Sequence, residues 1–379
     1  MADHFKRIGD YISVIDNRNT DGSVTKLMGI SIDKCYIPSV ANVIGTDLTN
    51  YKVIRKGQFA CSLMQVSRDQ RIPIAMYRDD SPAIMSPAYV MFEVARPDEL
   101  MPEYMELWFM RAEFDREASF YAVGGVRGSL DWNDFCNMEL PVPPIYEQRK
   151  IVHDYQVIMG RIELLQRINT NFQRIIDTIF EKFYSEYCDM ETVLSSICTL
   201  TSSKRVFAED YVSEGVPFYR GGEISLKKIG EPIENPLFIS REHYGAIKET
   251  YGIPTEGDIL ITAVGTIGNS YLVENEEFYF KDGNIIWIKD FIESEYRFFV
   301  YDFFQSSMFR AALNSLYIGS TQIALTIAGL SGMKINIPEV PALIEYASRS
   351  AVFRKQIQRN QKELFRLHNL RKLLLAKGT

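Results

Sequence analysis

The sequence has no apolar run long enough to cross a membrane. A membrane-spanning helix needs roughly 18 or more consecutive apolar residues, and no segment of this 379-residue chain reaches that length. The first residues, MADHFKRIGDY, also lack the apolar core of a secretory signal. These absences argue against a membrane or secreted protein, and we expect the chain to stay in the cytoplasm.

Cysteine and histidine are scarce, which leaves little material for a metal site or a disulfide framework. The five cysteines stand far apart without paired ligand spacing, so free thiols are expected rather than disulfides or zinc. The four histidines are also scattered, and the glycine-rich GGVRG of residues 124–128 lacks the Lys-Ser/Thr of a phosphate-binding loop. We therefore expect no catalytic group, no cofactor and no metal ion in this chain.

Positive charge is in short supply, since 42 Lys and Arg residues stand against 49 Asp and Glu residues and give a net charge of −7. A protein that binds nucleic acid needs local positive charge for phosphate contacts. Residues 340–379 supply it, with nine basic and two acidic residues. A smaller cluster lies in residues 52–71, where Asp69 is the one acidic residue. Its basic residues are Lys52, Arg55, Lys56, Arg68 and Arg71. Each cluster fits either a solvated surface or a DNA contact.

An internal repeat with an offset of 195 residues organises the chain. VGGVRGSLDWNDFCNMELPVPP, residues 123–144, aligns with YIGSTQIALTIAGLSGMKINIPE, residues 317–339. Matched pairs are Gly124 with Gly319, Met138 with Met333, Leu140 with Ile335, and Pro143 with Pro338. In each half of the chain, the domain is therefore predicted to end with a short strand followed by proline.

A long helix is predicted after each of these prolines, over residues 145–187 and 340–379. Seam positions alternate steps of four and three, as in a heptad repeat. In the first helix they are Ile151, Tyr155, Ile158, Ile162, Leu165, Asn169, Phe172, Ile176, Ile179 and Phe183. In the second they are Tyr346, Ser350, Phe353, Ile357, Asn360, Leu364, Leu367, Arg371 and Leu374. The pattern predicts that the two helices pair as an antiparallel coiled coil.

Each seam carries one asparagine, and such a residue commonly sets the register of a coiled coil. Pairing of Asn169 with Asn360 would place the pseudo-twofold centre near them, whereas the alternative is that both amides reach solvent. The last helix also carries a basic face, a candidate for contact with partner proteins or DNA phosphate. Its residues are Arg349, Arg354, Arg359, Lys362 and Arg366.

The regions ahead of the helices, residues 1–144 and 188–339, mix short β-rich runs with turns and a few helical stretches such as residues 103–121. We predict two globular domains of α/β (α+β) class. GQFACSLMQV after Lys56 and GDILITAVGT after Glu256 are predicted to be equivalent strands, offset by 200 residues. Elsewhere the domains differ too much to present identical surfaces, whereas the helices keep a common pattern.

Two divergent domains, each followed by a matching long helix, resemble the specificity subunit of type I restriction-modification systems. LPVPPIYEQRKI (140–151) is similar to that family's conserved start of its central helix, and INIPEVPALIEY (335–346) is a degenerate second copy without the glutamine. Further segments with this resemblance are FYRGGEI (218–224), IGSTQIALTIAGL (318–330), GISIDKCYIPS (29–39), YKVIRKGQFA (51–60), SPAYVMFEV (86–94) and VRGSLDWNDF (126–135).

The resemblance implies that each domain is a target recognition domain that reads one half of a split sequence in double-stranded DNA. It also implies that two methyltransferase subunits dock on the helices and that restriction subunits join them, so that this chain itself catalyses nothing. Two alternatives stay open: the specificity subunit of a related type II system, and a coiled-coil scaffold that does not bind DNA. Salt-sensitive binding to duplex DNA would separate the scaffold from the other two.

Candidate base-reading residues are those whose side chains form hydrogen bonds with base edges. In the first domain they are Gln65, Arg68, Arg71 and Arg127; in the second they are Lys204, Arg205, Arg220, Ser320, Thr321 and Gln322. The glycines around Arg127 suit either approach to a DNA groove or a tight connection. Gln322 could instead cap the start of a helix.

Overall fold

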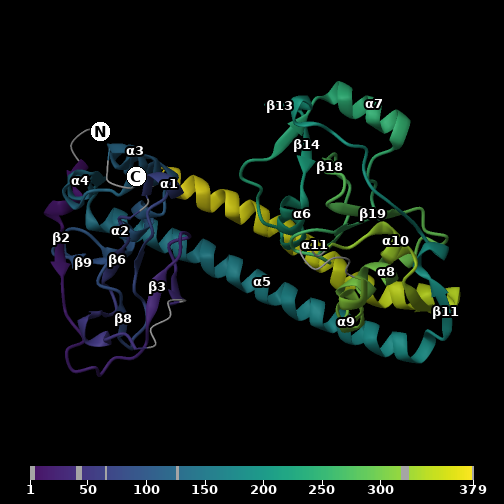
Figure 1. Ribbon diagram of the computed structural model, residues 1–379, viewed down its shortest axis with the longest axis horizontal. Helices are drawn as coiled ribbons and strands as arrows, with labels where there is room; N and C mark the ends of the chain where they lie inside the picture. Colours follow the sequence, from purple (N-terminus) through teal and green to yellow (C-terminus); the bar gives the residue numbers. More distant parts are fainter. Residues whose placement is uncertain (1–4, 40–44, 65, 125–127, 317–323, 378–379) are drawn as a thin grey trace. The chain divides into compact units, whose positions relative to one another are not determined.

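The computed structural model describes residues 5–39, 45–64, 66–124, 128–316 and 324–377. The chain divides into two compact units (Figure 1). The first comprises Met1–Gly160 and Leu370–Thr379, and the second comprises Arg161–Asn369. Each unit therefore contains part of both long helices, and each is described by itself below.

The first unit is built around a four-stranded antiparallel sheet of order β2-β9-β6-β7. Its strands are β1 Phe5–Arg7, β2 Ile12–Ile15, β3 Met28–Ile30, β4 Tyr36–Pro38, β5 Lys52–Ile54, β6 Phe59–Cys61, β7 Ile74–Met76, β8 Ala83–Met85, β9 Val90–Val94 and β10 Glu139–Pro141. Its shorter helices are α1 Val66–Asp69, α2 Pro102–Phe109, α3 Ala112–Tyr121 and α4 Trp132–Asn137. Three further strand pairs, β1-β10, β3-β4 and β5-β8, complete this unit among the described residues.

The second unit has two four-stranded sheets, of order β12-β19-β16-β17 and β13-β15-β14-β18. Its strands are β11 Met190–Val193, β12 Thr199–Thr201, β13 Tyr211–Val212, β14 Val216–Tyr219, β15 Leu237–Ile239, β16 Ile259–Thr262, β17 Ser270–Leu272, β18 Tyr279–Phe280, β19 Ile285–Lys289 and β20 Lys334–Ile337. Its shorter helices are α6 Gly221–Ile229, α7 Arg241–Tyr251, α8 Tyr296–Gln305, α9 Ser307–Leu316 and α10 Ile327–Ser331. The strands β14 and β18 run parallel, unlike the other paired strands.

The two units repeat one topology. The sheets β2-β9-β6-β7 and β12-β19-β16-β17 place corresponding strands in the same order, with antiparallel neighbours throughout. The strands predicted to be equivalent, β6 and β16, hold the same position in the two sheets. In each unit the first strand also pairs antiparallel with the last strand before a long helix, as β1 with β10 and β11 with β20. The predicted mixed α/β class with an internal repeat is confirmed.

The long helices are α5, Ile145–Tyr187, and α11, Val340–Lys377. They begin where the prolines end the preceding strands, because proline fits the first helical turn but cannot continue a strand. Inside each unit they cover an apolar core. Val152 of α5 belongs to the core of the first unit, and Phe180 of α5 and Leu343 of α11 belong to the core of the second.

Gln148, the glutamine of the first motif, is fully buried at the start of α5. Its Nε2 donates hydrogen bonds to the carbonyl oxygens of Glu99 (2.7 Å) and Pro143 (2.8 Å), and its Oε1 accepts one from the Met101 backbone N–H (2.8 Å). These bonds fix the start of α2 against the start of α5. At the repeat-equivalent position the second unit has Leu343, which is buried among apolar side chains.

Candidate nucleic-acid interface

The described candidates in the first unit lie on and after the short helix α1. Arg68 has a side chain that is 64% exposed, and its Nε donates to Asp69 Oδ1 at 2.7 Å. Arg71 is 46% exposed, and its Nη1 lies 3.1 Å from Asp33 Oδ1. Both guanidinium groups are therefore accessible, and each already has a carboxylate partner. Gln65 and Arg127 lie outside the described residues.

Gly128, the first described residue after Arg127, packs against α1. Its φ angle is +72°, and a Cβ atom built on it would stand 2.2 Å from Ser67 Oγ. The backbone at this point thus packs closely on α1, in a left-handed conformation that favours glycine. Gly128 and Arg68 consequently lie close together in the first domain.

In the second unit the end of the parallel pair β14 and β18 brings candidate residues together. Arg220 follows β14 at the start of α6, and its Nε donates to Glu223 Oε1 at 2.9 Å. Arg205 Nε contacts Asp282 Oδ2 at 2.8 Å, just beyond β18. Because the Lys281 backbone N–H donates to the Tyr219 carbonyl at 2.9 Å, both arginines belong to the same edge of the sheet.

Lys204 lies beside this edge, with its ammonium 4.9 Å from the ring centre of Tyr251 and its backbone N–H bonded to Tyr279 Oη at 2.7 Å. Lys204, Arg205 and Arg220 are all exposed. Ser320, Thr321 and Gln322 lie outside the described residues.

The four candidate arginines that the structure describes share an electrostatic property: each guanidinium faces a carboxylate of its own domain. The pairs of Arg68 and Arg71 are the more exposed, and exposed ion pairs contribute only about 0.2–1 kcal/mol each, so a DNA phosphate or a base edge could replace the carboxylate at little cost. The carboxylates of Glu223 and Asp282 are only 8% and 16% exposed, so their separation from the two arginines of the second domain would cost more. These pairs offset the charge of the four arginines, so among the described candidates only Lys204 forms no ion pair. The reading surfaces alone do not explain how an acidic chain would hold a polyanion.

Within the second unit, α5 and α11 pack antiparallel. Arg161 Nε contacts Glu363 Oε1 at 2.8 Å, and further along the rings of Phe172 and Phe353 lie 5.7 Å apart. Between these contacts Asn360 Nδ2 donates to Asn169 Oδ1 at 2.7 Å. The structure thus brings the two seam asparagines together, and their role in setting the register stays a prediction.

Replacing one seam asparagine is expected to cost more than replacing both. Asn360→Leu leaves the Asn169 amide against an apolar side chain, and we expect the free energy of unfolding to fall by about 1–3 kcal/mol. The double variant Asn169→Leu/Asn360→Leu removes both polar groups and should recover this loss. Urea denaturation of the four proteins measures the coupling between the two sites.

The exposed neighbour Thr170 offers a control, since Thr170→Ala should change the free energy of unfolding by less than about 0.5 kcal/mol. Equal and additive losses in the two single variants and the double variant would contradict a specific asparagine pair.

A buried polar cluster joins α8 to α11 in the second unit. Arg354 and Tyr346 of α11 both donate to Asp302 Oδ2, and Arg354 Nη1 also donates to Ser350 Oγ at 2.5 Å. The side chains of Arg354 and Asp302 are only 9% and 1% exposed. Burial raises the pKa of the Asp302 carboxyl, an effect that the adjacent guanidinium opposes. Arg354 therefore does not belong to the basic face of the last helix, and that part of the prediction is wrong.

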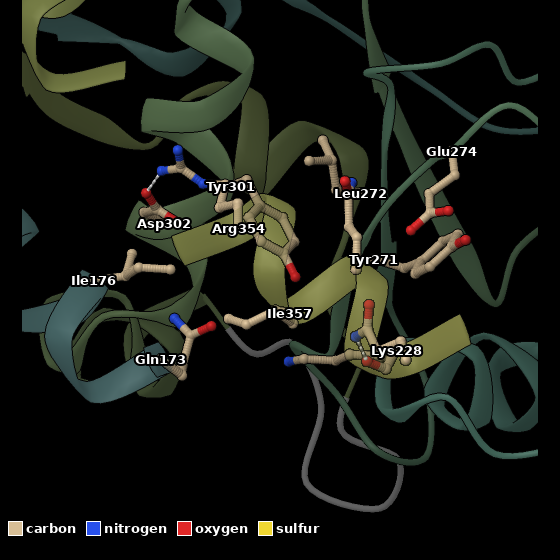
Figure 2. A pocket seen from close by; sticks show the side chains of 12 residues that line it. Gln173, Ile176, Lys228, Tyr271, Leu272, Glu274, Tyr301, Asp302, Arg354 and Ile357 are labelled. Atoms are coloured by element: carbon tan, nitrogen blue, oxygen red, sulfur yellow. Dashed lines mark hydrogen bonds and ion pairs between the residues drawn. The ribbon is translucent and has the colours of Figure 1, made fainter. Parts of the chain in front are cut away.

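A cavity of about 40 Å³ adjoins this cluster, and Figure 2 shows Gln173, Lys228 and Tyr301 directed toward it. Burial, with Arg310 nearby, lowers the pKa of Lys228 to about 8. Among the described residues, no hydrogen-bond partner reaches Asp302 Oδ1 or Arg354 Nε. The volume suffices for about two or three water molecules, the groups that usually complete such buried networks.

Sequence reasoning missed this cluster because Asp302 carries no signal of its own: it is one carboxylate among 49 acidic residues. A partial signal existed in the repeat, where Leu107, Ile151 and Met159 stand 195 residues before Asp302, Tyr346 and Arg354. The first copy of the repeat has three apolar residues where the second has three residues that can form hydrogen bonds with one another. Such a joint difference indicates that the three side chains interact.

No helix in the described part of the chain is both long and apolar enough to cross a membrane. The same residues contain no group of three or more His, Cys, Asp or Glu side chains arranged to hold a metal ion.

Comparisons with known proteins agree with this architecture. Residues 189–366 match the protein family described as "Type I restriction modification DNA specificity domain". The chain is 27% identical over 228 residues to a protein of Haemophilus influenzae described as a type I restriction enzyme specificity subunit; the match covers 58% of this chain and 56% of that protein. The chain thus matches little more than half the length of this curated relative.

Among solved structures, the fold is similar to the S subunit of a type I restriction-modification system from M. genitalium. The TM-score is 0.56 at 15% sequence identity, and the similarity covers 100% of this chain and 97% of the other. At this identity the likeness concerns the fold, with its two domains and long helices.

Proposed function

Because the chain belongs to the family of type I restriction-modification specificity subunits, we propose that it reads a two-part DNA sequence and directs partner subunits to it. The observation that carries this proposal is the repeat: the same sheet order occurs twice, and a long helix follows each time. Two domains on equivalent frames with different surfaces are suited to read two different half-sites. In this role the chain works in the cytoplasm and leaves the chemistry to its partners.

The long helices support a gap between the half-sites. At about 1.5 Å per residue, a helix of 43 residues such as α5 extends about 64 Å. One turn of B-DNA is about 34–36 Å, so a spacer of this length suits half-sites separated by base pairs that are not read. Partner methyltransferase subunits, two by the family's plan, and restriction subunits would assemble on this frame.

We propose that the described candidates read the two half-sites separately. Arg68 and Arg71 serve the first domain, and Lys204, Arg205 and Arg220 serve the second. Their exposure supports this assignment, as does the shared position of Arg205 and Arg220 at the ends of β14 and β18. Gln65, Arg127, Ser320, Thr321 and Gln322 stay candidates on the sequence alone.

Deletion of this gene is expected to abolish methylation of one two-part motif with a fixed gap. Genome-wide detection of methyladenine would compare cells that carry the gene and a partner methyltransferase gene with cells that lack only this gene. Because specificity resides in this chain, methylation should disappear at every copy of the motif and return when the gene is restored. An unchanged methylation pattern after the deletion, with both proteins produced in the reference cells, would contradict the proposed function.

A half-site variant sharpens the same experiment. In Arg205→Ala/Arg220→Ala we expect one half of the motif to become relaxed, since each lost bidentate base contact removes about 1–3 kcal/mol of discrimination. The other half should stay unchanged. The matched control is Arg241→Ala, which removes an exposed cation of α7 that is paired with Glu277.

A further inference from the structure

The exposed face of α11 carries a row of four cations. Lys355, Arg359, Lys362 and Arg366 follow one another in steps of four, three and four residues, which places them on one face of the helix. All four are exposed, and all four lie in the second unit. We call them the basic stripe. It differs from the basic face predicted from the sequence, because Arg354 is buried and Lys355 takes its place, and because Arg349, which pairs with Glu345, is not part of the row.

The basic stripe is largely free of carboxylate partners. Lys362 Nζ lies 3.1 Å from Glu274 Oε2. Lys355, Arg359 and Arg366 form no ion pair with any residue that the structure describes, and this distinguishes them from the candidate reading arginines. Unpaired cations therefore accumulate on α11 in a chain whose net charge is −7.

We propose that the basic stripe binds the sugar-phosphate backbone of the DNA next to the second half-site, without reading its sequence. This inference rests on the proposed function and adds to it the surface that supplies sequence-independent affinity. The dimensions are compatible: the eleven helical steps from Lys355 to Arg366 span about 16 Å. A DNA strand presents a phosphate about every 3.4 Å along its axis, or about five over that length.

The position of the basic stripe beside the second domain supports this partner. Gln361 Nε2 donates to the Lys228 carbonyl at 2.5 Å, so the end of α6 abuts α11 between Arg359 and Lys362. A Cβ atom on Gly230 would stand 3.0 Å from the Gln361 carbonyl oxygen, which shows how closely the two helices approach. DNA held by the second domain would thus lie within reach of cations fixed on a rigid helix.

An acidic surface of a methyltransferase subunit is the competing partner, and the repeat argues against it. The positions 195 residues earlier on α5 are Gly160, Leu164, Arg167 and Asn171, with one cation instead of four. Two equivalent partner subunits would dock on features that recur in both copies. The basic stripe does not recur, so it suits a contact made on one side only.

The test uses the full chain in complex with its methyltransferase partner and two duplexes, one with the two-part motif and one scrambled. The stripe variant is Lys355→Gln/Arg359→Gln/Arg366→Gln, which keeps good helix-forming residues. The control is Arg167→Gln/Lys182→Gln/Lys334→Gln, which removes three exposed cations of the same unit. Binding is measured across a series of salt concentrations.

We expect the stripe variant to lower the slope of log affinity against log salt concentration by about 2 to 3, because each phosphate contact contributes about 0.9. Affinity should fall by the same factor, about tenfold or more, for both duplexes, while the methylated motif is unchanged. The control should keep the wild-type slope.

Three outcomes would overturn the inference: an unchanged slope in the stripe variant, an equal drop in the control, or a loss of methyltransferase assembly with the slope intact. The last would assign the basic stripe to the protein partner. Failure of the proposed function is a separate result, since the wild-type complex would then bind both duplexes equally at every salt concentration.

Discussion

Arg354→Met is expected to lower the free energy of unfolding of the second unit by about 3–5 kcal/mol. The substitution removes the cation that faces Asp302 and leaves a carboxylate that is 1% exposed without its charge partner. Most of the cost is the penalty for a buried, uncompensated charge rather than the loss of an attractive contact. Equilibrium urea denaturation, with hydrogen exchange of α8 peptides to report on the second unit, measures the change.

The first half of the chain supplies the rescue. Leu107 and Met159 occupy the positions equivalent to Asp302 and Arg354, so Asp302→Leu/Arg354→Met copies a pair that the fold already uses. Apolar replacements of buried ion pairs are commonly neutral or stabilising, so the double variant should regain most of the loss. It should stay about 1–3 kcal/mol short of full recovery, because the buried Tyr346 hydroxyl loses its acceptor on Asp302. Arg349→Met, which removes an exposed partner of Glu345 on the same helix, should cost less than about 1 kcal/mol. A double variant as unstable as Arg354→Met alone would contradict this account.

Phe180→Ala is expected to cost about 3–5 kcal/mol in the same unit. The Phe180 side chain is fully buried, and its ring centre lies 5.6 Å from that of Phe299 and 5.9 Å from that of Tyr346. One ring thus joins α5, α8 and α11, and its removal leaves a cavity among side chains that are held by three separate helices. Urea denaturation and hydrogen exchange of α8 peptides give the measurement.

Phe180→Leu keeps most of the apolar volume and should cost less than about 1.5 kcal/mol. Leu375, which stands 195 residues later on α11, offers a repeat-equivalent control in the first unit. Because Leu375 is only partly buried, Leu375→Ala should cost about 1–2 kcal/mol. If Phe180→Ala cost no more than Phe180→Leu, the three-helix contact would not contribute to stability in this way.

The helical stretch of residues 103–121 illustrates the limit of periodicity. The sequence predicts continuous helical character there, whereas the structure has two helices, α2 and α3, separated at Met110 and Arg111. Arg111 adopts an extended backbone, and its guanidinium lies 4.3 Å from the ring centre of Trp108. No turn-forming glycine or proline marks this break in the sequence. We infer that packing on the core imposes it.

The sequence by itself determined the frame. Proline stops, an offset of 195 residues and a heptad seam define two domains and two long helices, because such features depend on local backbone restrictions and on the spacing of apolar side chains. The same features carry the resemblance to type I specificity subunits, since the motifs of that family are segments of this frame. The positions of Arg and Lys residues along the chain also follow from the sequence, but their burial and their ion-pair partners do not.

Which charges face one another follows from the packing of the helices and not from the sequence pattern. Arg354 and Arg359 look alike in the sequence, yet Arg354 is buried against Asp302 of α8 and Arg359 is exposed on the basic stripe. Asp302 and Arg354 are 52 residues apart, and no local pattern encodes such a pair. Its cause is the approach of α8 to α11, which removes water from one face of the helix and leaves its cations either paired or exposed.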